Sequence, residues 1–166
     1  MFNKLKKIKV MAFRTLSWGK PTLYISKLNA SGEPTTWSAL PTPVNESTTL
    51  EYSEGTEYRA EIEGGELEGY KRGKGNYTLN FTIREDPTTT IPITDDDGAI
   101  NDQYAIKLVP ETATAKGFYI KCATGYVAPN FSSTDGLSKE YHFTAITPTD
   151  GSGKIEWGVI EAPTTT

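Results

Sequence analysis

The chain contains 166 residues with a net charge of −4, and 36 % of its residues are hydrophobic. This length suits about one domain, the apolar content is too high for a wholly disordered chain, and no run reaches the ~18 apolar residues of a transmembrane helix. Cys122 and His142 are each the only residue of their kind, which excludes a disulfide framework and a metal site built from several cysteines or histidines.

The first eighteen residues read as a basic N-terminal arm. Residues 1–20 hold six basic side chains and no acid, so the remaining chain carries 11 bases against 21 acids. The apolar run of residues 10–13 is too short for a signal-peptide core, and we therefore expect the arm to be retained. The arm itself contains Lys4, Lys6, Lys7, Lys9 and Arg14, and Lys20 follows it.

Alternation of apolar and polar residues predicts strands along most of the chain. In the clearest case, Leu79, Phe81 and Ile83 share one face and threonines the other. The same pattern places Cys122 inward beside Ile120, and Trp157 in the core. The predicted strands are 23–28, 76–84, 103–109, 118–123, 141–146 and 155–159.

These strands predict a mainly β protein: a single-domain antiparallel β-sandwich or partial barrel over residues 19–161, with at most one short helix. We place that helix between Asp95 and Gln103, and expect residues 162–166 to form a flexible tail.

A strongly acidic segment runs from Glu46 to Glu68. It contains eight glutamates against one base, Arg59, and its apolar residues still alternate with polar ones. We interpret it as an acidic hairpin with Gly55 between its halves, followed by a basic mobile loop, Lys71–Gly75. Like charges on one face repel each other across paired strands. Such a face either keeps the protein soluble or repels an anionic partner.

The sequence offers little for catalysis or metal binding. Asp95–Gly98 departs from the EF-hand ligand pattern, so we favour an acidic turn there, although a looser cation site with Asp102 stays open. His142 and Cys122 lack a visible triad, and nothing singles out a pair of glycosidase carboxylates. We expect no enzyme activity, no metal and no cofactor. Trp37, in the loop 32–43, is the best candidate for an exposed contact with a sugar or a neighbouring subunit.

Several segments, in this order, together resemble the major tail proteins of long-tailed bacteriophages, of the type found in phages and prophages of gut bacteria. Each segment is a strand with its turn, and residues 1–18 lie outside the resemblance. The segments are 19–25, 37–43, 60–66, 76–81, 97–100, 104–111, 141–148 and 157–158.

The resemblance implies a β-sandwich or partial barrel with one flanking helix, for which this sequence shows no strong signal. It also implies rings, usually hexameric, that stack through loops and arms into a tail tube with an acidic lumen for DNA. The partners would be further copies and other tail proteins, and the location the virion tail, assembled in the host bacterial cytoplasm.

From these expectations we assign two candidate sets of residues. The lumen-facing acidic hairpin comprises Glu51, Glu54, Glu57, Glu61 and Glu63. The contacts between subunits comprise Lys4, Lys6, Lys7, Lys9, Arg14, Trp37, Lys71, Arg72 and Lys74. The alternative is a monomeric β-sandwich that binds carbohydrate or adhesin ligands.

Overall fold

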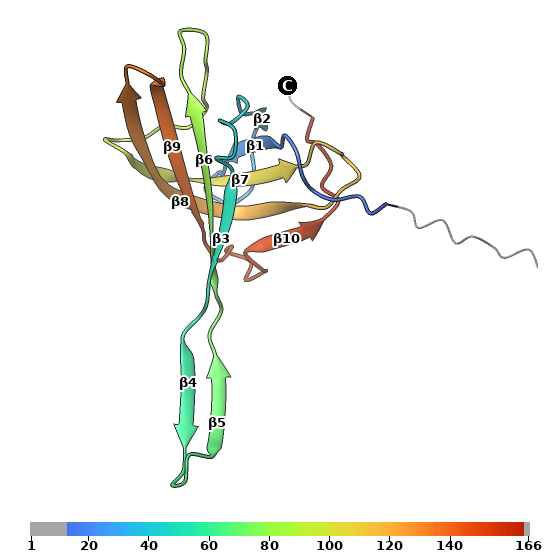
Figure 1. The fold of residues 1–166 in the computed structure, drawn as a ribbon, viewed down its shortest axis with the longest axis vertical. Coiled ribbons are helices and arrows are strands. Elements are labelled where there is room, and N and C mark those ends of the chain that lie inside the picture. The colour runs from blue at the N-terminus through green and yellow to red at the C-terminus, as the bar shows by residue number, and fades with distance from the viewer. Residues whose placement is uncertain (1–12, 165–166) are drawn as a thin grey trace, which may run out of the picture.

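The computed structural model describes residues 13–164 and contains ten strands and no helix in that range (Figure 1). None of the described segments is therefore a helix that could span a membrane. The strands are β1 (Thr22–Lys27), β2 (Ser38–Ala39), β3 (Thr49–Ser53), β4 (Glu57–Glu61), β5 (Leu67–Arg72), β6 (Asn76–Arg84), β7 (Ala99–Val109), β8 (Gly117–Ser132), β9 (Gly136–Ala145) and β10 (Ile155–Gly158).

Eight strands form one antiparallel sheet in the order β2-β1-β7-β8-β9-β6-β3, and β10 pairs with β8 beside this path. The long strand β8 connects the two halves of this sheet. Its first residues pair with β10, and its later residues pair with β9. Figure 1 shows β7 and the start of β8 running across the direction of β6 and β9. The sheet folds over itself around one core, which confirms the mainly β, single-domain, sandwich-like expectation.

Both halves of the sheet contribute to the core. Leu79, Phe81 and Ile83 of β6 are fully buried, as the alternation predicts. Phe81 stacks on Tyr141 and Phe143 of β9 with ring centroids 5.2 and 6.0 Å apart. Across the core lie residues of β1, β7 and β8, namely Leu23, Ile25, Tyr104, Ile106 and Ile120.

An irregularity between β7 and β8 corrects the predicted face of Cys122. Tyr104 pairs with Ala123, but Ile106 pairs with Ile120, so β8 carries an extra residue at this point. Such a bulge reverses which face the following side chains occupy. Cys122 is buried as expected, but in a second, smaller cluster on the opposite face from Ile120.

The predicted helix near Asp95 is absent, and a turn occupies its place. Asp97 and Gly98 have φ values of 47° and 89°, and Asp95 Oδ2 accepts a hydrogen bond of 3.0 Å from the Gly98 amide. β7 then begins at Ala99. Short aspartate-rich segments favour such side-chain-to-backbone bonds over a helix.

The acidic segment is not one hairpin, which corrects a third expectation. Its first half, β3, pairs with β6 at the edge of the large sheet. Its second half, β4, pairs with β5 in a separate two-stranded sheet that projects from the body (Figure 1). The predicted basic loop is therefore partly strand, because Lys71 and Arg72 end β5.

Candidate functional site

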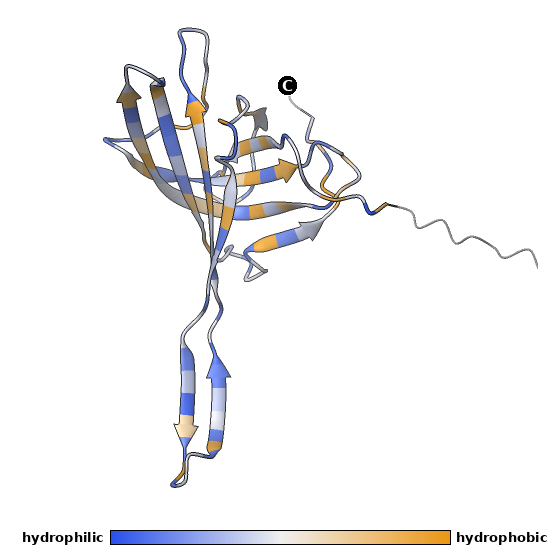
Figure 2. Ribbon diagram, viewed as in Figure 1, coloured by the Kyte–Doolittle hydropathy of each residue, from blue (hydrophilic) through white to orange (hydrophobic). Residues whose placement is uncertain are grey.

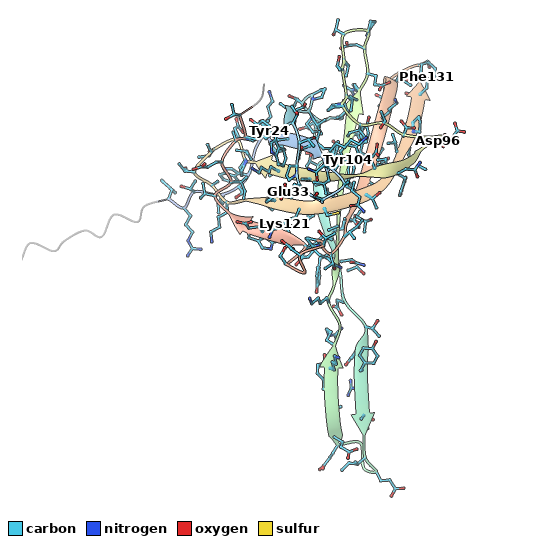
Figure 3. The ribbon with its side chains drawn as sticks, turned by 180° about the vertical axis from the view of Figure 1, so that it is seen from behind. Tyr24, Glu33, Asp96, Tyr104, Lys121 and Phe131 are labelled. Carbon is cyan, nitrogen blue, oxygen red and sulfur yellow. The ribbon has the colours of Figure 1, made fainter. Side chains whose placement is uncertain are left out.

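The most unusual feature is the projecting hairpin, which we define as residues 54–74. Every residue of β4 and β5 is exposed, and their side chains extend into open space (Figure 3). Most of the hairpin is hydrophilic, with apolar residues towards its tip (Figure 2). These apolar residues are Ile62 and Leu67, and Tyr58 and Tyr70 are exposed in the strands.

One face of the projecting hairpin, the ionic face, carries a network of ion pairs. Arg59 reaches Glu57 and Glu61 over 3.6 and 3.1 Å. Arg72 reaches Glu54 over 2.9 Å and Glu57 over 3.4 Å, and its Nε donates to Tyr70 Oη. The hydrogen bond to Tyr70 is the main cause that raises the pKa of Arg72. Three of the five expected acidic residues, Glu54, Glu57 and Glu61, are thus paired with arginines.

The opposite face, the flat face, is smooth and without these pairs. The register Tyr58↔Lys71 and Ala60↔Gly69 places these four residues together on it. Gly69 has no side chain, and the methyl group of Ala60 rises little above the backbone. Tyr58 therefore stands as the one large apolar group on a shallow strand surface, the type of residue that often anchors an interface.

The neck of the projecting hairpin is built from glycines. A Cβ on Gly55 would overlap the Gly73 carbonyl oxygen, and a Cβ on Gly75 would overlap the Tyr52 ring. Only glycine allows the backbones to approach so closely. The Gly73 amide donates to Thr56 O over 2.8 Å, and Lys154 Nζ donates to Gly75 O over 3.1 Å.

The five predicted lumen residues are spread over three places. Glu51 lies on β3, on the outer face of the large sheet, where it pairs with Thr78. Glu54 lies at the neck, Glu57 and Glu61 lie on the ionic face, and Glu63 lies in the turn at the tip. Of these five residues, only Glu51 therefore lies on the large sheet.

The predicted contact residues are also separated. Lys71 lies on the flat face, Arg72 on the ionic face and Lys74 in the neck. Arg14 is exposed, whereas Lys4, Lys6, Lys7 and Lys9 lie outside the described residues. Trp37 is half-buried rather than exposed: its ring packs 6.0 Å from that of Tyr119, and Lys107 Nζ lies 4.6 Å from its centroid. Desolvation by burial is the main cause that raises the pKa of Tyr119.

The outer face of β3, β6 and β9 forms a polar face, which the sequence analysis did not single out. On it, His142 Nδ1 lies 2.5 Å from Asn80 Oδ1, and Nε2 lies 3.0 Å from Glu140 Oε1. The Tyr126 ring stacks on the imidazole at 4.5 Å. The face comprises Glu51, Thr78, Asn80, Thr82, Arg84, Ser138, Glu140, His142 and Thr144.

His142 and Cys122 do not form a catalytic pair. Both imidazole nitrogens of His142 are engaged by Asn80 and Glu140. The Cys122 thiol instead contacts Gln103 Oε1 at 3.4 Å, and burial raises its pKa. A thiol with a raised pKa is mostly protonated near neutral pH and is a weak nucleophile.

The aspartates considered for a cation site do not gather. Asp102 forms an ion pair with Lys27 over 3.2 Å and accepts from Thr94, while Asp95 is bonded to the Gly98 amide. Over residues 13–164, no cluster of three or more potential metal ligands is present. The acidic-turn interpretation fits this arrangement.

A groove opens between β3 and β10, on the side where the sandwich is not closed. Its volume is about 930 Å³, and core residues such as Leu79 and Phe118 form its floor. Trp157 stands at its wall and is 58 % exposed, so the prediction that it belongs to the core is wrong. β10 is a short edge strand that pairs only with β8, which leaves Trp157 half uncovered.

Two basic residues, Lys20 and Lys116, line the groove together with one acid, Glu46. Neither lysine forms an ion pair with any of the described residues. The Trp157 ring also continues an aromatic row, with edge contacts of 5.8 Å to Phe118 and 6.2 Å to Tyr77. The groove therefore combines an apolar floor with charges of both signs, and the Glu111 carboxylate accepts a further hydrogen bond of 3.0 Å from the Lys20 amide.

No protein-family model matches this chain, and a search of the curated proteins finds no match.

Proposed function

We propose that this chain is a structural subunit that assembles into rings, and that the rings stack into a phage tail tube through which DNA passes. The observation that carries the proposal is the free edge of the large sheet. β3 pairs with β6 on one side and ends the sheet on the other. An open edge strand presents unpaired backbone groups, which a neighbouring copy satisfies by extending the sheet.

A ring closed in this way would turn one face of every sheet towards a common lumen. The polar face suits that position, because it consists mainly of hydroxyl and amide side chains, and its Glu51 forms no ion pair with the described residues. Fixed negative charge keeps a polyanion from adsorbing to the wall. The glutamates on the projecting hairpin would then lie outside the lumen wall. In this proposal the chain needs no cofactor and performs no catalysis.

Light scattering combined with negative-stain microscopy tests the proposal directly. We expect the mass to rise with protein concentration and the images to show rings or tubes with a central hole. Adding a tail-tip preparation from a related phage as a nucleus covers assembly that needs a template. A protein that stays monomeric under both conditions, or forms only irregular aggregates, contradicts the proposal.

A second candidate function is favoured by the aromatic row beside the groove. Tyr52 and Tyr77 lie 5.2 Å apart, and the row continues through Trp157. Exposed aromatic rings are amphipathic and can stack on sugar faces. This candidate predicts a monomer that binds members of a glycan array and loses that binding in Trp157→Ala. A monomer without glycan binding contradicts it.

A further inference from the structure

The short strand β10 connects the wall of the groove with the neck of the projecting hairpin. Its Trp157 ring lines the groove, and Lys154, directly before its first residue, reaches the neck. Among the described strands, β10 pairs only with β8. A short strand with one partner is held by few backbone hydrogen bonds, so β10 is among the parts of the large sheet that shift most easily.

The first route from β10 to the neck is a polar contact. Lys154 Nζ donates to the Gly75 carbonyl oxygen over 3.1 Å and also contacts Asn76 Oδ1. The bond from the Gly73 amide to the Thr56 carbonyl, by contrast, joins the two strands of the neck to each other. The Lys154 ammonium ties the neck to a different part of the body. A hydrogen bond from such a charged donor is stronger than one between neutral groups.

The second route from β10 to the neck consists of aromatic rings. The Trp157 ring makes an edge contact with Tyr77, with centroids 6.2 Å apart, and the Tyr77 ring lies 5.2 Å from that of Tyr52. The Tyr52 ring fills the space beside Gly75, because a Cβ on that glycine would overlap it. Both routes from β10 therefore end at Gly75.

The direction of the neck decides where the tip of the projecting hairpin lies. The hairpin extends from the body as a separate sheet (Figure 1). About ten strand residues of about 3.3 Å each separate the neck from the tip, so a tilt of about 10° at the neck moves the tip by about 6 Å. A small displacement at Gly75 is thus amplified at the tip.

We propose that β10 is a lever that couples the Trp157 wall of the groove to the direction of the projecting hairpin. A displacement of Trp157 shifts β10 and, through Lys154 and the aromatic rings, the neck at Gly75. A coupling between two sites acts in both directions, so a displacement of the neck also loosens β10. The lever is a property of the single chain and does not rest on the proposed assembly.

Pulsed electron paramagnetic resonance between two spin labels tests the lever. In a Cys122→Ala background, Glu66→Cys carries one label at the tip and Thr114→Cys carries the other in the turn between β7 and β8. Because β7 and the start of β8 run across the direction of β6 and β9, this turn lies to the side of the hairpin, and the label distance changes when the hairpin tilts (Figure 1). Dilution with unlabelled protein restricts the distances to one chain, and circular dichroism confirms that each variant is folded.

Two pairs of matched variants are compared in this labelled chain. Lys154→Met removes the ammonium group and keeps the length of the side chain, and Lys139→Met is its control, because Lys139 pairs with Glu85 away from the neck. Trp157→Ala removes the ring of the groove wall, and Phe131→Ala removes an exposed ring near the end of β8. We expect Lys154→Met and Trp157→Ala each to widen the distance distribution at least about twofold, and both controls to match the wild type.

Gly75→Ala tests the reverse direction, from the neck to the groove wall. The added Cβ would overlap the Tyr52 ring and the Ser53 carbonyl, so the neck must shift. We expect the amides of β10 to exchange hydrogen at least about tenfold faster than in the wild type, while those of β9 keep their rate. Gly69→Ala is the control, since its Cβ would meet only the Ala60 methyl group at 3.7 Å.

The inference is overturned by a distance distribution in Lys154→Met or Trp157→Ala that is as narrow as in the wild type. Unchanged exchange of β10 in Gly75→Ala also overturns it, as does an equal response of the control variants, because the effect would then not run through β10. All of these results concern a single chain. They are therefore distinguishable from a failure of the proposed function, which is decided by whether rings form.

Discussion

Gly55 and Gly73 cross at the neck of the projecting hairpin so closely that a Cβ on Gly55 would overlap the Gly73 carbonyl oxygen. The Gly73 amide, in turn, donates to the carbonyl of Thr56 over 2.8 Å. The direction in which the hairpin leaves the body is thus set by a backbone contact that a side chain would disrupt. Because β4 and β5 form a separate sheet, this contact and the bond from Lys154 Nζ to Gly75 O hold the neck beside the large sheet.

Replacement of Gly55 by alanine should therefore loosen the neck and leave the body intact. The added methyl group meets backbone, which cannot rotate away as a side chain can. We expect hydrogen exchange of the Gly73 amide to accelerate at least about tenfold, while amides of β6 and β9 exchange at the wild-type rate. Gly69→Ala is the matched control, since its Cβ would meet only the Ala60 methyl group at 3.7 Å. Equal exchange rates in both variants would contradict the assigned role of the neck.

Phe81 should be among the most costly core residues to truncate. Its ring is fully buried and stacks on two rings of β9, so alanine leaves a cavity between the halves of the sheet. We expect Phe81→Ala to lower the free energy of unfolding by about 3–5 kcal/mol in urea denaturation. Phe131→Ala removes an exposed ring and should change it by less than about 0.5 kcal/mol. Similar losses in the two variants would mean that the core does not lie where the structure places it.

Strands whose burial follows local alternation are the part of this fold that the sequence predicts. β6 spans Asn76–Arg84, the range that strict alternation predicts, because each side chain there meets either core or solvent. Alternation predicts the wrong face for Cys122, because the bulge depends on the pairing with β7, which no local pattern encodes. It also predicts a core position for Trp157, because alternation cannot distinguish an edge strand from a central one. The groove could not be predicted for the same reason, since segments distant in the chain form it.

Tyr141 should make the fold sensitive to alkaline pH. Burial, with contributions from Glu85 and Asp95, raises the pKa of its hydroxyl well above the ordinary value of 10.0. Above pH 10 the unfolded chain therefore loses a proton that the folded chain keeps, so stability falls as pH rises. A single such group contributes up to about 1.4 kcal/mol per pH unit in this range.

Comparison of the wild type with Tyr141→Phe isolates this contribution, because the remaining lysines and tyrosines are common to both proteins. Urea midpoints measured from pH 8 to pH 11 should decline less steeply in Tyr141→Phe above pH 10 and run parallel below pH 9. Parallel curves over the whole range would show that the hydroxyl ionises equally well in the folded and unfolded chains.

Charge reversal on the polar face tests the lumen separately from assembly. Glu51 is exposed on β3 and forms no ion pair with the described residues, so Glu51→Lys should not disturb the fold. If the polar face surrounds DNA, assembled Glu51→Lys rings should retain short duplex DNA that wild-type rings release, with affinity that falls steeply as salt rises.

Glu33→Lys makes the same change in charge on the loop between β1 and β2, outside the polar face (Figure 3), and should leave DNA retention at the wild-type level. Filter binding at 50 and 200 mM salt measures the difference, and equal retention by the two variants would place the polar face away from the DNA path.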